Sequence, residues 1–542
     1  MVSTLADVEA TLPRKLRGVI NKEYGVNVRV DKSLGAVHYM AGASKVMPEF
    51  RFTLKADGKL LLRTYKSGDW ETGLRRAYDD LVAQSGAFAG LSITLPEPTS
   101  HTGKAAPPPR ERKPHLRIGM QTWGSHGDIR PLLALAEGLQ SSGHEVTLAI
   151  TCIDSTEWNT SISKTGVKIQ SVATPVIPDK NEYAAIMEAW TNEANGFKKN
   201  DIAMTRLYRP VEAENYQMAE QLCDDNDLVI GHYFHYPLQT AAEKAGRDYV
   251  SVMLSHGLVP SSLKAPVGYP MLAGKLLGNR FAWSSLRAAY NKRLKGDPDR
   301  LRAAHGLSPA KDVISDVFSS HQLTLIAVSP QICERQRDWA DYYQVCGFLD
   351  MPSLSTEGEL SPGLEEFLSN GDPPVYMTFG THMPSDLPSQ RDMVALLSEA
   401  ATIANCRAII QAPLWQECGL KPTPAVYYVH ASPYSRSFPR CRAVVHHGGA
   451  GTSQAATLAG KPSVVVVFGA DQALWGQELE RIGISPHLLF ARKVTAEQLA
   501  KSIKDVIGSS DMQETAKKIG AAMNGENGVD MAVKLINERF NA

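Results

Sequence analysis

The pattern of hydrophobic and polar positions divides the chain into differently built regions. Residues 50–65 alternate apolar and polar side chains around Asp57-Gly58, a pair favoured in tight hairpin turns. Residues 70–88 then place apolar side chains three and four positions apart, as on one face of a helix. We therefore expect residues 1–98 to form a small α+β domain, and no catalytic constellation is found in it.

A proline-rich segment at 99–115 separates this region from the rest of the chain. It contains three consecutive prolines at 107–109 beside small and charged residues. Proline fixes φ and lacks a backbone N–H, so the run can form neither a helix nor an inner strand and favours extended geometry. We interpret the segment as an interdomain linker.

After the linker, short apolar runs alternate with helical patterns. This alternation is typical of parallel, doubly wound sheets with right-handed crossovers. A segment rich in proline, glycine and serine at 349–364 predicts a hinge. The expected fold class is therefore α/β, with two Rossmann-like domains at 116–350 and 351–542. The predicted strands are 116–122, 146–151, 227–231, 249–254, 375–379, 408–411, 443–446 and 463–467.

Charge and cysteine content narrow the possible partners and location. The 57 basic residues balance 57 acidic ones, so we expect neither a nucleic-acid partner nor a polybasic membrane anchor. The seven cysteines are scattered, which favours a reducing compartment over a zinc site or a disulfide framework. The N-terminus does not resemble a signal peptide, and no apolar run is long enough to span a bilayer. We expect a cytoplasmic protein.

The first candidate loop, 122–131, reads T-W-G-S-H-G-D-I-R-P. Ligands of doubly wound domains bind at the carboxyl ends of strands, where this loop is expected. Asp128 either caps the following helix or acts as a general base. His126 competes as the base because imidazole titrates near neutrality. Pro131 is expected in the first turn of the helix. The two glycines lack the dinucleotide-binding spacing, which disfavours an NAD enzyme.

The second candidate loop, 446–452, reads H-H-G-G-A-G-T and connects a predicted strand to a predicted helix at 453–458. Its glycines let the backbone approach a ligand, and the helix start offers free N–H groups and a positive dipole. This combination is typical of a phosphate cradle. His446 at its lip can donate a further hydrogen bond to a diphosphate. The alternative is an ordinary turn with an incidental pair of histidines.

Two further loops carry polar side chains at predicted strand ends. In 468–475, Asp471 and Gln472 offer acceptors and donors suited to adjacent sugar hydroxyls, or they cap a helix. Trp475 is expected to pack rather than to stack on a sugar. In the T-F-G-T-H loop, Thr381 lies where it could touch phosphate.

Taken in order, the motifs G-S-H-G-D-I-R-P, T-F-G-T, H-H-G-G-A-G-T and D-Q-A-L-W-G resemble a known family. They are similar to the inverting family-one glycosyltransferases with the GT-B fold, especially sterol 3-β-glucosyltransferases and bacterial antibiotic glycosyltransferases. The resemblance covers about residues 116–540 and is most specific over 432–486. It implies two Rossmann-like domains that face a cleft, with the acceptor in 116–350 and the nucleotide-sugar donor in 351–542.

The resemblance also implies roles for individual residues. It favours Asp128 over His126 as the base that activates the acceptor. It assigns His446 to the donor diphosphate, and Asp471 with Gln472 to the donor sugar. The other expected donor-binding residues are Gly124, Ser125, Thr381, Ser432, Tyr434, Gly448, Gly449, Gly451 and Thr452.

The implied reaction is a single inverting displacement that moves a hexose to a hydroxyl of an apolar acceptor such as a sterol, lipid or polyketide. The expected donor is UDP-glucose, without a metal or other cofactor. Aromatic and aliphatic residues in 232–237, 254–260 and 268–283 suggest the acceptor pocket. Tyr434 and Arg436 depart from the histidine and tryptophan common in the family, so uridine and thymidine donors both stay open. A deoxysugar transferase that uses a dTDP-sugar is the alternative.

An alternative hypothesis is that the chain is not an enzyme. It would then be a non-catalytic nucleotide-sugar sensor or an adaptor that acts through residues 1–98. The presence of Asp128, His446 and the Asp471-Gln472 pair favours an enzyme. The N-terminal domain is then expected to serve self-association, docking or peripheral membrane contact.

Overall fold

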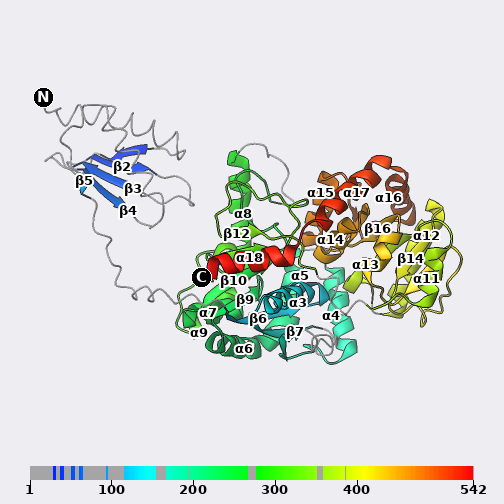
Figure 1. Cartoon of the computed structure of the whole chain (residues 1–542), viewed down its shortest axis with the longest axis horizontal. Helices are drawn as coiled ribbons and strands as arrows, with labels where there is room; N and C mark the ends of the chain where they lie inside the picture. The colour runs from blue at the N-terminus through cyan, green and yellow to red at the C-terminus, as the bar shows by residue number, and fades with distance from the viewer. Residues whose placement is uncertain are drawn as a thin grey trace. The chain divides into compact units, whose positions relative to one another are not determined.

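The computed structural model divides the chain into two compact units, Met1–Glu111 and Arg112–Ala542 (Figure 1). The structure describes five strands in the first unit. In the second unit it describes residues 115–153, 166–193, 196–266, 276–350, 358–384 and 386–540. The domain boundaries predicted at residues 98, 115 and 350 stay predictions.

The first unit contains a five-stranded sheet with the order β1-β2-β3-β4-β5. Neighbouring strands are antiparallel from β1 to β4, and β5 is parallel to β4. Leu54 pairs with Leu60, which confirms the predicted hairpin. Its turn and the predicted helix at 70–88 lie outside the described residues. The strands are β1 (Val28–Asp31), β2 (Val37–Ala41), β3 (Phe50–Leu54), β4 (Leu60–Thr64) and β5 (Ile93–Thr94).

The second unit begins with a seven-stranded sheet of order β12-β11-β10-β9-β6-β7-β8, in which all neighbours are parallel. We call the part built around it the middle domain. Its predicted strands are confirmed within one or two residues. β8, β11 and β12 were not predicted. The strands are β6 (Arg117–Gly124), β7 (Glu145–Cys152), β8 (Lys168–Ser171), β9 (Leu228–His232), β10 (Asp248–Met253), β11 (Leu323–Ile326) and β12 (Tyr343–Val345).

A six-stranded parallel sheet of order β15-β14-β13-β16-β17-β18 forms the C-terminal domain. β14, β16 and β17 have the predicted bounds, because their β-branched and alanine runs are buried on both faces. The doubly wound α/β class is therefore confirmed. The strands are β13 (Val375–Thr378), β14 (Ala408–Gln411), β15 (Val426–Val429), β16 (Ala443–His446), β17 (Ser463–Val467) and β18 (Leu489–Phe490).

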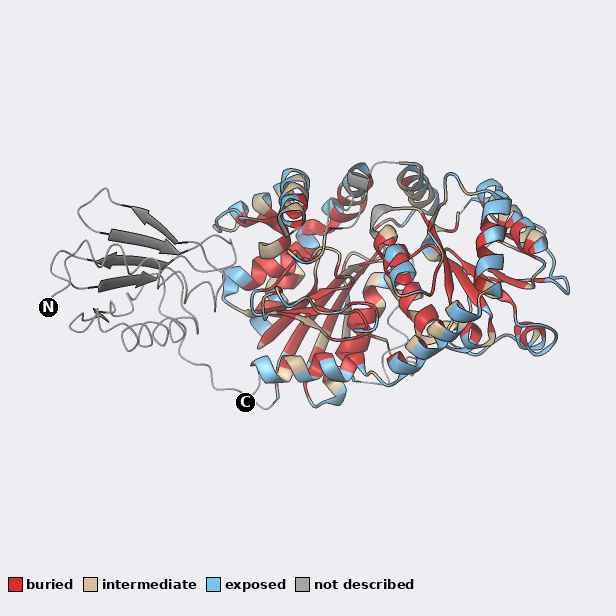
Figure 2. Cartoon of the chain, turned by 90° about the horizontal axis from the view of Figure 1, so that it is seen from above, coloured by how far each residue is buried: buried red, intermediate tan, exposed pale blue. Residues whose placement is uncertain are grey.

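Helices cover the faces of both sheets, so that the strands are buried and the outer sides of the helices are exposed (Figure 2). The helices of the middle domain are α3 (His126–Ser141), α4 (Lys180–Asn192), α5 (Gly196–Ile202), α6 (Glu212–Asp225), α7 (Tyr236–Ala245), α8 (Leu276–Leu294), α9 (Gly296–Ala304) and α10 (Val313–Asp316). Those that follow are α11 (Pro362–Ser369), α12 (Leu387–Ala404), α13 (Tyr434–Ser437), α14 (Ala450–Leu458), α15 (Ala470–Arg481), α16 (Ala496–Gly508), α17 (Ser510–Asn524) and α18 (Gly528–Phe540).

The last helix, α18, crosses back from the C-terminal domain and packs on the middle domain (Figure 1). Val529, Val533 and Ile536 belong to the same buried cluster as residues of α3 and β6. A Cβ added at Gly138 of α3 would lie 2.2 Å from a methyl carbon of Val529, so the close contact requires glycine. The end of the chain thus ties the two domains together.

The start of α3 corrects one prediction. The helix begins at His126, so Pro131 lies inside it rather than in its first turn. Ser125 and Asp128 provide a helix start several residues earlier, through contacts described below.

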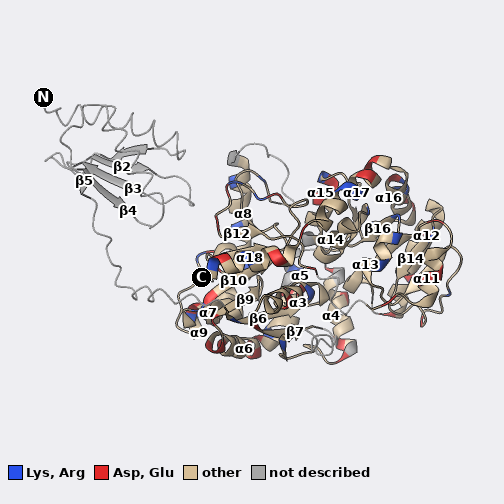
Figure 3. Cartoon of the chain, in the orientation of Figure 1, with Lys and Arg blue, Asp and Glu red and all other residues tan. Residues whose placement is uncertain are grey.

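The distribution of charged residues and the state of the cysteines agree with the sequence analysis. Basic and acidic residues are interspersed along the helices (Figure 3). All seven cysteines carry free thiols. Within the part of the chain that the structure describes, no helix has the length and apolar character needed to cross a membrane.

Candidate active site

The carboxyl ends of the two sheets meet at one interface. Gln454 of α14 donates from Nε2 to the Ala327 carbonyl at 3.0 Å and accepts from the Ser329 N–H at 2.9 Å, directly after β11. In the other direction, Lys199 of α5 donates to the carbonyl of Phe468, directly after β17. Since ligands of such sheets bind at these ends, the interface is where a site is expected.

Asp128 is fixed at the start of α3 by the residues before it. Its Oδ2 accepts hydrogen bonds from the Ser125 N–H at 2.9 Å and the Ser125 hydroxyl at 3.0 Å. Gly124 has φ of +135°, and a Cβ there would lie 2.4 Å from the same oxygen. The capping role of Asp128 is thus observed, and it engages only one carboxylate oxygen. Gly124 and Ser125, expected to bind the donor, here contact Asp128.

The second oxygen of Asp128 faces a histidine that the sequence did not single out. His232 ends β9, and its Nε2 lies 3.7 Å from Asp128 Oδ1. The His232 side chain is 5% exposed, and neither ring nitrogen has a hydrogen-bond partner among the described residues. Burial lowers the pKa of His232, against the opposing charge of Asp128. His126, the competing base, lies exposed at the first position of α3.

The loop between β16 and α14 is a tight turn that leads into an uncapped helix. Gly448 has φ of +84°, and a Cβ there would lie 2.8 Å from the Gln472 carbonyl oxygen. Gly449 precedes α14, and no described side chain caps the helix there. A Cβ at Gly451 would meet no described atom within 4 Å, and Thr452 lies half-buried beside it. The helix start thus has no side-chain cap and has open space beside Gly451, which are features that an anion site requires.

His446 has one ring nitrogen engaged and one without a partner. Its Nδ1 accepts from the Gly448 N–H at 3.1 Å, which assigns the ring proton to Nε2. This Nε2 is buried and has no hydrogen-bond partner among the described residues. Burial lowers the pKa of His446 to about 3, so the ring is neutral near pH 7 and its Nε2–H is a donor. A buried donor left unpaired is costly, and a ligand acceptor would offset that cost.

His447, which the sequence analysis did not single out, reaches the cradle more directly. A Cβ at Gly449 would lie 2.3 Å from its Nε2, and one at Gly380 would lie 3.3 Å from its Cε1. Its ring stacks on His382 with centroids 4.7 Å apart. Burial lowers the pKa of His447 to about 4. The T-F-G-T-H loop therefore lies against this histidine, with Thr381 exposed beside it. The sequence signal that could have identified His447 is its position as the second histidine of the H-H-G-G motif.

Gln472 is engaged by its own helix start. Its Oε1 accepts from the N–H groups of Phe468 at 2.7 Å and Gly469 at 3.1 Å, and its Nε2 lies 3.0 Å from His382 Nε2. Asp471 precedes it on α15, with a side chain outside the described part of the structure. Trp475 is 3% exposed, which confirms that it packs in the core.

Ser432 and Tyr434, which were expected to bind the donor, are held by internal hydrogen bonds. The Tyr434 hydroxyl lies 3.0 Å from Thr378 Oγ1 and donates to Gln411 Oε1 at 2.9 Å. The Ser432 hydroxyl lies 2.7 Å from the Tyr376 hydroxyl. The side chains of Ser432 and Tyr434 thus hold the turn together.

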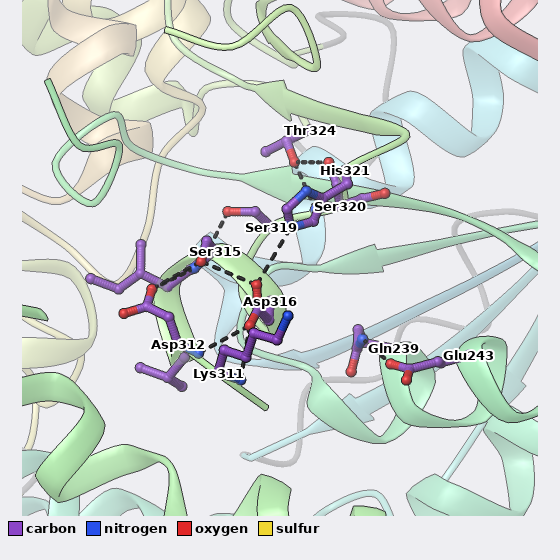
Figure 4. Close-up of polar contacts among 12 residues, drawn as sticks. Gln239, Glu243, Lys311, Asp312, Ser315, Asp316, Ser319, Ser320, His321 and Thr324 are labelled. Carbon is purple, nitrogen blue, oxygen red and sulfur yellow. Dashed lines mark hydrogen bonds and ion pairs between the residues drawn. The ribbon is translucent and has the colours of Figure 1, made fainter. Parts of the chain in front are cut away.

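Elsewhere in the middle domain, a second polar cluster surrounds α10 (Figure 4). Asp312 accepts from the Ser315 N–H at 3.0 Å and from Arg287 Nε at 2.9 Å. Asp316 accepts from the N–H groups of Lys311 and Asp312 at 2.9 and 3.0 Å. Both carboxylates serve the local fold. The acidic run at 224–227 is similar, since its Asp227 pairs with Arg117 at 3.3 Å.

Comparison with known proteins assigns the family. Residues 395–536 match the model of the erythromycin biosynthesis protein CIII-like C-terminal domain. The chain is 30% identical over 433 residues to an O-mycaminosyltylonolide 6-deoxyallosyltransferase of Streptomyces fradiae, covering 78% of this chain and 97% of that protein. The chain belongs to the family-one glycosyltransferases.

Other similarities agree with this assignment. This glycosyltransferase is 26% identical over 440 residues to a sterol 3-beta-glucosyltransferase of Arabidopsis thaliana, covering 78% of the chain and 65% of that longer relative. The crystal structure of the glycotransferase of kitacinnamycin has a TM-score of 0.57 at 16% identity, covering 80% of this chain and 100% of that one. The expected GT-B fold is confirmed.

Proposed function

We propose that this glycosyltransferase moves glucose from UDP-glucose to a hydroxyl of an apolar acceptor, with inversion at the anomeric carbon. The observation that carries the proposal is the set of buried, unpartnered imidazole nitrogens of His446 and His447 beside the uncapped start of α14. The similarity to a sterol 3-beta-glucosyltransferase supports the choice of glucose and of an apolar acceptor.

In the proposed reaction, Asp128 is the general base. Its Oδ2 is held by Ser125, which leaves Oδ1 to take the proton from the acceptor hydroxyl. The acceptor oxygen forms a bond to the anomeric carbon while the bond from that carbon to the diphosphate oxygen breaks. One displacement inverts the configuration. General-base assistance of this kind contributes about a hundred- to ten-thousand-fold in rate.

The departing diphosphate is received by neutral donors. The first-turn N–H groups of α14 and the ring N–H groups of His446 and His447 are fixed before the charge develops, so they stabilise it without reorganisation. Because these donors carry the stabilisation, we propose that transfer needs no metal.

Aromatic side chains beside the base support an apolar acceptor. Tyr233 follows His232 with ring centroids 4.7 Å apart, and Phe234 stacks on Phe318 at 5.1 Å. Tyr233 and Phe234 are only partly buried. Residues 268–275 of the third predicted acceptor segment lie outside the described residues.

A second candidate is transfer of a deoxysugar from a dTDP-sugar. The relative that is 30% identical is a 6-deoxyallosyltransferase, so this alternative has direct support. The hydroxyls of Ser432 and Tyr434 are engaged within the fold, so they do not separate uridine from thymidine.

A transfer assay tests the proposal. UDP-glucose, dTDP-glucose and a dTDP-6-deoxyhexose are each incubated with a sterol and with a macrolide aglycone, in EDTA, and the products are analysed by mass spectrometry and NMR. We expect a β-glucoside from UDP-glucose and none with Asp128→Asn. Transfer only from dTDP donors would support the second candidate. Nucleotide-sugar binding without any transfer would support the sensor reading and contradict the proposal.

A further inference from the structure

A glutamine of the cradle helix pairs with the backbone of the middle domain. Gln454 of α14 is 2% exposed. Its Nε2 donates to the Ala327 carbonyl at 3.0 Å, and its Oε1 accepts from the Ser329 N–H at 2.9 Å. Because one amide group donates and the other accepts, the pair of bonds fixes both the position and the direction of the side chain. We call this contact the glutamine clamp.

The glutamine clamp lies close to the cradle along α14. Gln454 follows Gly451 by three residues, which is a rise of about 4.5 Å along the helix axis. Ala450, the first residue of α14, packs against the buried cluster that contains residues of α3 and β6. A polar and an apolar contact therefore seat the start of the cradle helix on the middle domain.

The other end of the clamp lies close to the strand that sets the proposed base. In the sheet, β10 lies between β11 and β9. His232, beside Asp128, is the last residue of β9. The Ala327 N–H donates to the Met253 carbonyl of β10 at 2.8 Å, so the clamped backbone continues the sheet. Since neighbouring strands are about 4.8 Å apart, only about 10 Å of packed sheet separates the clamp from β9.

A second path holds the same loop to the far end of α14. The Ser329 hydroxyl donates to Glu526 Oε1 at 3.1 Å, directly after α17. Asn524, at the end of α17, donates to the Leu458 carbonyl at the end of α14 at 3.0 Å. The loop after β11 is thus connected to both ends of the cradle helix, and α14 is held between the two contacts.

We propose that Gln454 is a positioning residue for transfer, whose two hydrogen bonds set the distance between the diphosphate cradle and Asp128. The transferred sugar lies between these two groups. Inverting displacement requires the acceptor oxygen, the anomeric carbon and the diphosphate oxygen to lie in line. A misplacement of about 1 Å lowers such a rate about a hundred-fold. The inference rests on the proposed function of the cradle, and it adds the residue that aligns the donor with the base.

The test compares Gln454→Met with Gln390→Met. Gln390 is also buried, and it donates to the Pro384 carbonyl at 2.5 Å and accepts from the Leu414 N–H at 2.6 Å. Both variants lose a pair of buried amide hydrogen bonds, but the partners of Gln390 lie within its own domain. Calorimetry measures the affinity for the nucleotide sugar that the wild type uses. A rapid-quench assay measures a single turnover with the sterol or macrolide aglycone that the wild type glycosylates.

We expect Gln454→Met to keep the donor affinity while its transfer rate falls about ten- to a hundred-fold. Gln390→Met should keep both, although its melting temperature falls as well. If Gln454→Met does not fold, Gln454→Asn is measured in the same way, because it keeps the amide on a side chain that is one methylene shorter.

Three results would overturn the inference. An unchanged transfer rate in the Gln454 variant means that the clamp does not align the donor with the base. Parallel losses of donor affinity and rate mean that Gln454 acts on the donor site itself. Equal loss of rate in Gln390→Met means that any pair of buried hydrogen bonds has this effect. Failure of the proposed function is distinct, because the wild type would then transfer from none of the nucleotide sugars.

Discussion

The cradle between β16 and α14 and the cluster around α10 both gather polar groups at the start of a helix, and they differ in whether those groups are satisfied. At α10, Asp312 and Asp316 accept from named backbone and side-chain donors (Figure 4). In the cradle, His446 Nε2 and His447 Nδ1 are buried without a partner among the described residues. A cluster that closes on itself stabilises the fold, whereas one left open is suited to a ligand.

The largest expected effect is at the proposed base. Asp128→Asn keeps an oxygen that can accept from Ser125 but cannot take a proton. We expect the transfer rate to fall about a hundred- to ten-thousand-fold with an unchanged melting temperature. Asp312→Asn is the matched control, because it makes the same change in the closed cluster. Equal rates in the two variants would show that Asp128 only caps α3.

The next prediction concerns a substitution in the cradle that should block ligand binding without affecting folding. A methyl group at Gly451 meets no described atom within 4 Å, so Gly451→Ala should fold normally. The methyl would occupy the space proposed for the diphosphate, and we expect donor affinity to fall about tenfold or more, as calorimetry measures it. Full affinity in this variant would place the diphosphate elsewhere.

A smaller effect is expected in the closed cluster. Asp312→Ala leaves Arg287 and Asn291 without their buried acceptor. We expect the free energy of unfolding in urea to fall by about 1–3 kcal/mol, with donor affinity retained. Loss of donor binding in a folded sample of this variant would remove the distinction between the two clusters.

The smallest effect concerns the domain interface and pH. Glu478 is 4% exposed and pairs with Lys264, with Arg481 at 2.7 Å and with His256 at 3.5 Å. Burial raises the pKa of Glu478, but the His256 hydrogen bond and the Lys264 charge outweigh burial and lower the pKa to about 2.

Because this pKa is depressed from an ordinary value of 4.5, the stabilisation is complete above about pH 4.5 and is lost as pH falls towards 2. From pH 7 to pH 3.5, the wild type should lose about 1 kcal/mol more of its unfolding free energy than Glu478→Gln. Denaturant titrations at the two pH values measure this. Parallel losses would mean that the interface charge does not govern the acid response.

Much of the fold was predictable because it depends on local pattern. The runs that became β14, β16 and β17 are short, apolar and flanked by glycine or proline, and their bounds were predicted as observed. The strands β8 and β12 contain exposed or half-buried polar residues that hide the pattern. The early start of α3 depended on how Asp128 and Ser125 bond, which spacing alone could not decide.

The candidate site was predictable only where it lies within one loop. The cradle motif is contiguous, so its glycines and His446 were found from the sequence. His232 and Lys199 reach the site from strands and helices far away along the chain, and each looks ordinary in its own segment. Only the folded structure shows that His232 lies beside Asp128 and that Lys199 lies beside Phe468, because both contacts depend on long-range packing.

The central claim is that the open cradle binds a nucleotide sugar, and calorimetric titration tests it most directly. UDP-glucose and dTDP-glucose would be titrated in EDTA into the wild type, His446→Ala, His447→Ala and Asp312→Ala. The account predicts saturable binding of one nucleotide sugar that is lost or strongly weakened in both histidine variants and kept in Asp312→Ala. Absence of binding in a folded wild type, or equal affinity in all four proteins, would contradict it.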